Sequence, residues 1–356
     1  MGRQAARSLH LSRKMLRTNT APLALTLVLL AIPGAAPAAK PPAGAPAQGQ
    51  SPAPPAPTTP APAAPAEPAT TMPVKPTDAD VQVALERSSF SPGEIDGRGG
   101  ANTRKALQAF QRSRSLPVTA RLSAETWKSL WTASAGPTLA SYTITVDDAA
   151  GPYLAKIPKD TEEQAKLERL GYTSVLEMLG ERFHAAPEYL RRLNPRARFA
   201  AGEEIKTPNT RLPVLAEAAS GEVRVVVSRK AGTLTVERGG KVLFFAPVTS
   251  GSAHDPLPIG DWKVKGVARD PVFRYNPDLF WDSDASAVKA TIPAGPNNPV
   301  GVVWIDLDKP HYGLHGTPEP RTIGRTASHG CVRLTNWDAM TVAGLVKPGT
   351  PVLLRP

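Results

Sequence analysis

The chain contains 356 residues, and its 42 Lys and Arg residues outnumber 31 Asp and Glu residues, which gives a formal net charge of +11 at pH 7. The single cysteine excludes an internal disulfide, so every folded part must be stabilised by an ordinary apolar core. Five positive charges lie within the first 17 residues. Without them the net charge falls to +6, and no long basic run of the kind that binds nucleic acid remains. This balance suits an anionic surface such as a cell wall or a membrane.

Residues 1–39 have the order of a secretory signal peptide. Basic residues come first, an apolar run follows at Leu23–Ile32, and Pro33-Gly34 leads into small residues that end at Ala38 and Ala39. The apolar run is shorter than the roughly 20 residues of a membrane-spanning helix. Cleavage near Ala38 or Ala39 is therefore favoured over an uncleaved membrane anchor. We expect export to the periplasm or cell envelope.

Residues 40–76 consist almost entirely of Pro, Ala, Thr and Gly. Too few large apolar side chains are present to offset the entropy lost on folding, so this segment is predicted to stay unfolded. Its prolines favour extended polyproline conformations. We expect a semi-rigid spacer that holds the following domains at a distance.

Residues 77–133 predict a small domain of three short helices. Asp78 or Asp80 is expected to cap the first helix, Asn102 the second and Ser123 the third. The stretch resembles the peptidoglycan-binding domain found beside many wall enzymes. The matching motifs are Ile95-Asp96-Gly97, Phe110-Gln111, Leu116-Pro117-Val118 and Thr126-Trp127. The resemblance implies binding to peptidoglycan, and a helical bundle without a ligand is the alternative.

Residues 141–210 predict a small α+β module. A strand at Tyr142–Val146 is followed by a helix that begins at Thr173 or Ser174, a second helix that ends at Asn194-Pro195, and a closing strand. This order, with Arg182-Phe183-His184, resembles a lysin motif. The stretch between Asp148 and Tyr172 is longer than such modules carry. Glycan binding and packing against the next domain are therefore both open interpretations.

Residues 221–356 predict a mainly β domain. Gly239-Gly240 separates two β-rich runs, which indicates a hairpin because glycine accepts positive φ. Asn336 is expected to cap a helix. The predicted strands are Val223–Val227, Thr233–Glu237, Val242–Ala246, Asp261–Val264, Gly301–Ile305 and Val352–Leu354. We expect a sandwich or barrel-like domain with one or two helices, in a chain that is multidomain as a whole.

A candidate catalytic site lies in this last domain. Cys331 follows Ser328-His329-Gly330, and His315 lies 16 positions upstream. A cysteine attacks only as the thiolate, so it needs a base or a lowered pKa, and His315 is the candidate base. In an exported chain a lone thiol beside two histidines favours a chemical use over a buried, inert cysteine.

The residues around this pair have candidate supporting roles. Gly330 permits a tight turn, and the amides near it are candidates for holding a developing oxyanion. Arg333 is expected to face the same way as Cys331 on an extended segment and to bind a substrate carboxylate or, alternatively, to form an internal ion pair. Arg325 is a candidate substrate contact or a solvated loop charge. His329 is an orienting residue or a structural histidine.

The motifs His315-Gly316-Thr317, Ile323-Gly324 and Ser328-His329-Gly330-Cys331-Val332-Arg333-Leu334 resemble the signature of the L,D-transpeptidase catalytic domain. The resemblance covers roughly residues 222–355. It implies that Cys331 is the acylated nucleophile and that His315 transfers the proton while a backbone carbonyl, that of Gly316, holds its ring. It also implies supporting roles for Ser328, His329 and Gly330.

The implied donor substrate is a tetrapeptide stem of peptidoglycan, attacked at its third residue, diaminopimelate, with loss of D-Ala. The implied acceptor is an amine of another stem, giving a 3→3 cross-link, or of a wall-attached protein. The resemblance implies no metal and no cofactor, and the sequence has no His-Glu-x-x-His or other usual zinc spacing.

Two other functions remain open at this point. An L,D-carboxypeptidase of the same fold would use water in place of the acceptor amine, and it would carry the same motif. A non-catalytic peptidoglycan-binding protein would depend on the N-terminal modules alone. The oligomeric state cannot be inferred from the sequence.

Overall fold

The computed structural model describes residues 71–356 except 135, 211–220 and 285. The predicted signal peptide and most of the predicted spacer therefore lie outside the described residues. Contacts group residues 65–356 into one compact unit, and every feature described below belongs to it. No helix in this described part combines the length and apolar character needed to cross a membrane.

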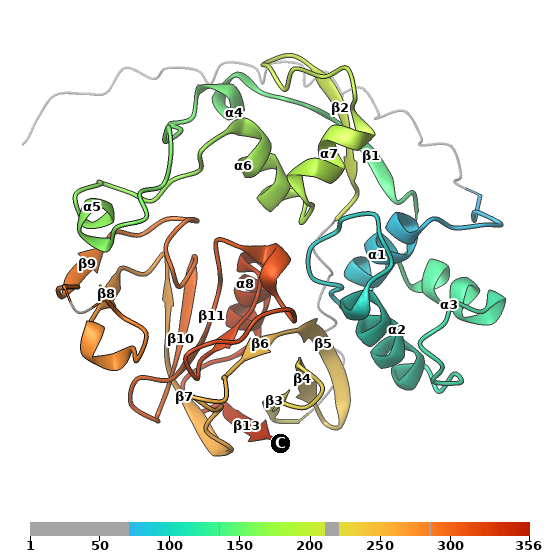
Figure 1. Cartoon of the computed structure of the whole chain (residues 1–356). Helices are drawn as coiled ribbons and strands as arrows, with labels where there is room; N and C mark the ends of the chain where they lie inside the picture. The colour runs from blue at the N-terminus through green and yellow to red at the C-terminus, as the bar shows by residue number, and fades with distance from the viewer. Residues whose placement is uncertain (1–70, 135, 211–220, 285) are drawn as a thin grey trace, which may run out of the picture. The chain divides into compact units, whose positions relative to one another are not determined.

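The predicted three-helix region is present (Figure 1). Its helices are α1 (Asp78–Arg87), α2 (Ala101–Ser113) and α3 (Ala124–Ser134). Two of the predicted caps are wrong. Thr77 caps α1 in a capping box with Asp80, and Gly100 precedes α2 without a side-chain cap. Asn102 instead donates its Nδ2 hydrogen to the carbonyl of Ile323, 2.9 Å away. Ser123 accepts from the Thr126 amide at 3.1 Å, as expected of a cap.

The α+β module has the predicted strand–helix–helix–strand order. Its elements are β1 (Leu139–Thr143), α6 (Val175–Arg182), α7 (Pro187–Leu193) and β2 (Glu204–Pro208), and β1 pairs with β2 in antiparallel register. The strand predicted to reach Val146 ends at Thr143 because Thr145 caps a further helix, α4 (Val146–Ala150). The long stretch before Tyr172 contains α4 and α5 (Thr161–Ala165).

The C-terminal region is built on a sheet that has nine strands among the described residues, in the order β5-β4-β3-β13-β7-β10-β11-β12-β6. Their bounds are β3 (Val223–Ser228), β4 (Thr233–Arg238), β5 (Lys241–Pro247), β6 (Thr249–Ser250), β7 (Gly260–Arg269), β10 (Val303–Leu307), β11 (Gly313–His315), β12 (Val332–Arg333) and β13 (Pro351–Arg355). The predicted hairpin joins β4 to β5, with Gly239 at φ 55° and Gly240 at φ 77°.

The two edges of this sheet come from one stretch of chain. The edge strand β5 ends at Pro247, the opposite edge strand β6 begins at Thr249, and only Val248 separates them. The sheet must therefore curl until its edges approach, which gives the barrel-like form expected from the sequence. Its interior is filled by buried aliphatic side chains, including Val225, Leu234, Val264, Ile305 and Leu354.

One helix and a small hairpin complete the domain. Helix α8 (Asn336–Leu345) contributes Ala339 and Val342 to the core. Its N-cap is Thr335 and not Asn336, because the Thr335 hydroxyl accepts from the Asp338 amide. Strands β8 (Phe273–Tyr275) and β9 (Ala290–Ile292) pair separately from the main sheet. Two short 3₁₀ helices, η1 (Pro277–Leu279) and η2 (Pro320–Thr322), lie in the connections.

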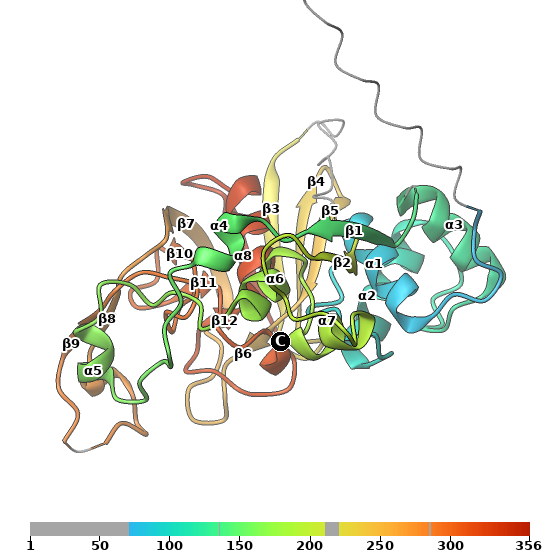
Figure 2. The ribbon, with the colours of Figure 1, turned by 90° about the horizontal axis from the view of Figure 1, so that it is seen from above.

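The regions share cores. On β5, Phe244 packs into the interior of the main sheet, whereas its neighbour Phe245 packs among the three N-terminal helices. Phe245 stacks on Phe90, with ring centroids 6.4 Å apart. Likewise, Ala79 and Val83 of α1 pack with α6 and α7 (Figure 2).

Candidate active site

The candidate catalytic residues lie on two short neighbouring strands. Strands β11 and β12 are parallel, with Leu314 opposite Val332 and His315 opposite Arg333. Extending this register by one residue sets Gly313 opposite Cys331. Since alternate residues of a strand share a face, Cys331 and Arg333 face the same side as His315. The predicted grouping of a thiol, an imidazole and a guanidinium is therefore present.

His315 is buried and held at one ring nitrogen. Its Nδ1 lies 2.7 Å from the carbonyl oxygen of Gly316, so Nδ1 carries the hydrogen and Nε2 is the free basic nitrogen. The ring stacks on Trp304, with centroids 5.6 Å apart and planes 23° apart. Burial, and then the nearby Arg333 charge, lower the pKa of His315 to about 4, against the opposing effect of the Gly316 carbonyl.

Cys331 lies between opposing electrostatic influences. Burial raises the pKa of its thiol, while a backbone hydrogen bond from Gly313 and the charge of Arg333 act to lower it. The Sγ atom lies 3.7 Å from the carbonyl oxygen of His311. A raised thiol pKa and a lowered imidazole pKa together favour the neutral pair over a thiolate–imidazolium pair at neutral pH. The free His315 Nε2 can then accept the thiol proton as Cys331 attacks.

The turn before the cysteine is fixed by its own side chains. The Ser328 hydroxyl donates to the carbonyl of Cys331 and accepts from the amide of Gly251, each at 2.6 Å. Gly330 has φ 90°, and a Cβ atom there would lie 2.7 Å from the ring of Tyr312. Glycine is therefore required at position 330 both for the backbone conformation and for space.

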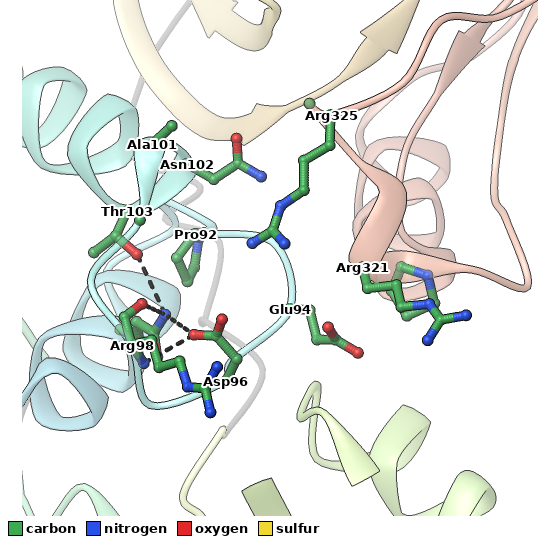
Figure 3. Close-up of a pocket in the computed structure, with 13 residues that line it drawn as sticks. Pro92, Glu94, Asp96, Arg98, Ala101, Asn102, Thr103, Arg321 and Arg325 are labelled. Carbon is green, nitrogen blue, oxygen red and sulfur yellow. Dashed lines mark hydrogen bonds between the residues drawn. The ribbon is translucent and has the colours of Figure 1, made fainter. Parts of the chain in front are cut away.

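The remaining predicted site residues divide between two places. His329 pairs its Nε2 with Asp282 at 2.9 Å and packs against Phe280, so its observed contacts are with the connection between β8 and β9. Arg325 lines a separate hollow with Glu94 and Asn102 (Figure 3). The other candidate substrate arginine, Arg333, lies on β12 two residues past Cys331, and its charge acts on the thiol.

Several residues at the site carried no signal in the sequence analysis. Trp304 was assigned only to a strand, yet it covers His315. Asn336 was expected to be a cap, but its Oδ1 accepts from the Val302 amide at 3.2 Å and closely approaches Gly316. A Cβ atom on Gly316 would lie 2.2 Å from that Oδ1 atom, which explains the glycine beside His315. Only the strand register could have linked these positions.

No group of three or more His, Cys, Asp or Glu side chains suited to holding a metal ion occurs within the part of the chain that the structure describes.

Two regions of the chain match known protein families. Residues 222–354 match the family model of the L,D-transpeptidase catalytic domain, and residues 77–130 match that of the putative peptidoglycan binding domain. The chain is 28% identical to the putative L,D-transpeptidase YkuD of Bacillus licheniformis over 184 residues, which cover 51% of this chain and 93% of that protein. It is 38% identical to the probable L,D-transpeptidase ErfK/SrfK of Salmonella typhimurium over 127 residues, 34% of this chain and 38% of that protein.

Two solved structures are also similar. An L,D-transpeptidase from Mycobacterium smegmatis is 22% identical, with 45% of this chain and 76% of that one covered at a TM-score of 0.32. The catalytic domain of the E. faecium L,D-transpeptidase is 21% identical, with 38% and 98% covered at a TM-score of 0.29.

The fold and the site define a mainly β domain that carries a cysteine and a histidine on adjacent strands. Residues 222–354 match the L,D-transpeptidase catalytic domain, and residues 77–130 match the putative peptidoglycan binding domain.

Proposed function

We propose that this protein is an exported peptidoglycan L,D-transpeptidase that uses Cys331 as its nucleophile. The observation that carries the proposal is the His315 Nδ1–Gly316 carbonyl hydrogen bond of 2.7 Å, which leaves Nε2 as the basic nitrogen of a buried, uncharged imidazole. Such a ring accepts a proton at neutral pH, as a thiol of raised pKa requires.

In the first half-reaction the Cys331 sulfur attacks the carbonyl carbon of the third stem residue, and the thiol proton passes to His315 Nε2. The amide bond to D-Ala breaks, the nitrogen of D-Ala takes that proton, and a thioester remains. Arg333 supports this step because its charge favours the thiolate over the thiol. The backbone amides beside Gly330 are the proposed oxyanion donors.

In the second half-reaction an amine of another stem, or of a wall-attached protein, gives up a proton to His315 and attacks the thioester carbonyl. The C–S bond breaks, a new amide forms, and Cys331 recovers its proton. If water is the acceptor instead, the product is a free tripeptide. Ser328 serves this chemistry by fixing the turn that carries Cys331, since its hydroxyl bonds both Cys331 and Gly251.

Mass spectrometry of the purified protein with a disaccharide-tetrapeptide, with and without a second stem, tests the proposal. We expect loss of D-Ala, a thioester on the protein and a 3→3 cross-linked dimer, all abolished in Cys331→Ala. A tripeptide as the sole product would support the carboxypeptidase. An unmodified substrate and an unlabelled wild-type cysteine, or transfer that persists in Cys331→Ala, would overturn the proposal.

A further inference from the structure

A groove separate from Cys331 lies where three parts of the chain meet. One wall is the turn between α1 and α2, at residues 92–103, and the facing wall is the segment around η2, at residues 320–325 (Figure 3). This hollow is open to solvent. A second open hollow shares Glu94, Pro320 and Arg321 with it and extends along α6 and α7. The two hollows therefore form one groove.

The groove is formed before any ligand binds, because its walls hold each other. The Asn102 side chain on α2 donates to the Ile323 carbonyl at 2.9 Å. Gly324 packs so closely that a Cβ atom there, at φ 73°, would lie 2.6 Å from the Asn102 side-chain oxygen. The side chains along the groove are thus presented on a fixed frame, which lowers the entropy cost of binding.

Arginines gather in the first hollow and carboxyl groups in the second, although Asp96 also lines the first hollow and Arg321 lines both. Arg98, Arg321 and Arg325 line the first hollow, and none of them forms an ion pair or a side-chain hydrogen bond with another described residue. The second hollow is bordered by four glutamates and by Glu94 at the junction. Burial raises the pKa of Glu181 to about 8, and Glu177 accepts hydrogen bonds from Thr173 and Asn297. Glu188 and Glu319 are therefore the glutamates that remain to meet a cation. Tyr172 and Trp337 add aromatic surface at this acidic end.

These charges match a dipolar ligand. Guanidinium groups without a partner are suited to paired hydrogen bonds with a carboxylate, and the glutamates are suited to an amine. We propose that this groove binds a peptide with a free carboxylate at Arg321 and Arg325 and a free amine at the glutamate end, and that a peptidoglycan stem peptide is its ligand. The identity of the ligand rests on the proposed function, whereas the class of ligand rests on the groove itself.

The groove also accounts for Arg325, for which the sequence leaves a substrate contact and a solvated loop charge both open. Figure 3 shows its side chain extending into the hollow toward Asp96 and Glu94. Both arginines act on Glu94, whose pKa is raised to about 7 by burial and by Glu188 and Asp96 while Arg321 and Arg325 oppose that rise. Protonation of Glu94 removes a negative charge beside the carboxylate end, so binding of the carboxylate is expected to strengthen as pH falls below about 7.

Binding to isotopically labelled Cys331→Ala protein tests the proposal without turnover. The probe is the free tetrapeptide stem, and the readout is the amide signals of Gly100 and Gly324, which line the groove. We expect both signals to shift on titration. The double variant Arg321→Ala/Arg325→Ala should weaken this site about tenfold or more. Arg121→Ala, which removes an exposed arginine outside the groove, is the matched control and should bind as the parent does.

Two modified stems test the two ends separately. A stem with its carboxylates amidated should lose affinity at the arginine end, and an N-acetylated stem should lose affinity at the glutamate end. Equal binding of the parent and the double variant, or an equal loss in Arg121→Ala, would overturn the site. Full binding of either modified stem would overturn the dipolar assignment. Because turnover is absent throughout, failure of acyl transfer in the wild-type protein would leave this result intact.

Discussion

At the scale of single residues, the site depends on keeping His315 uncharged. Its ring is buried, stacked on Trp304 and bonded to a backbone carbonyl, so it has a fixed orientation without a carboxylate partner. Arg333 disfavours the imidazolium while favouring the thiolate of Cys331. In the proposed function, the pair is therefore expected to transfer one proton from sulfur to nitrogen during attack and not to rest as an ion pair.

This arrangement predicts an unusually acidic limit to activity. A general base works only when deprotonated, and the His315 pKa of about 4 lies below the ordinary histidine value of 6.5. The quantity to measure is the second-order rate constant of Cys331 acylation, which is the acylation rate at low donor concentration divided by that concentration. This constant should not change as pH falls to about 5, and it should decrease as pH drops through about 4. In Arg333→Gln the same decrease should occur at higher pH, because the positive charge that lowers the His315 pKa is lost. A decrease centred near pH 6.5 in the wild-type protein would contradict the lowered pKa of His315.

At the scale of elements, two buried carboxyl groups lie at the start of α8, those of Asp338 on α8 and Glu86 on α1. Ser91 donates to Asp338 at 3.1 Å, and His184 pairs with Glu86 at 2.7 Å while stacking on Trp337. The second oxygens of Asp338 and Glu86 and the Trp337 Nε1 have no hydrogen-bond partner in the described structure. Burial, and then the nearby Glu86, raise the pKa of Asp338 well above its usual value.

Asp338→Asn is therefore predicted to stabilise the protein increasingly as pH rises. A carboxyl group with a raised folded-state pKa binds a proton on folding, so the wild type loses stability as pH rises from the unfolded value near 3.8 toward the folded value. An amide of the same shape does not ionise. The melting temperature of the variant minus that of the wild type should thus be more positive at pH 8 than at pH 5. The exposed Glu125→Gln on α3 is the control, and a difference that shrinks with pH would refute the prediction.

The helices and strands also show how much of the fold can be predicted from the sequence. Periodicity and turn residues located the three N-terminal helices, the β4–β5 hairpin and the last helix. Caps at three helices were misassigned. At α1 and α8 neighbouring positions offer similar hydroxyl, carboxylate or amide chemistry, and only backbone geometry selects Thr77 and Thr335. Helix α2 follows Gly100, which has no side chain to cap it. The Cys331–His315–Arg333 grouping was predictable from local motifs. The place of Arg325 was not, since it depends on where the η2 segment meets α2.

At the scale of the described unit, the regions are joined through shared side chains and not merely linked in sequence. Strand β5 serves two cores, with Phe244 in the sheet interior and Phe245 among α1, α2 and α3. The backbone continues this contact, since Phe245 donates to the Ser89 carbonyl at 2.9 Å and accepts from the Ser91 amide at 2.8 Å. The three N-terminal helices and the main sheet should therefore stabilise each other.

Adjacent phenylalanines on β5 allow this coupling to be measured. Both are 3% exposed, so truncation of either to alanine should cost about 3–5 kcal/mol of unfolding free energy. The location of the effect should differ. Phe245→Ala should preferentially speed amide hydrogen exchange in α1 and α2, because it leaves a cavity against Phe90 and Phe110. Phe244→Ala should instead preferentially speed exchange in β4 and β13. If the helices exchange equally fast in both variants, β5 does not divide its two faces between separate cores. If Phe245→Ala leaves the helices as protected as in the wild type, the helices hold together without the sheet.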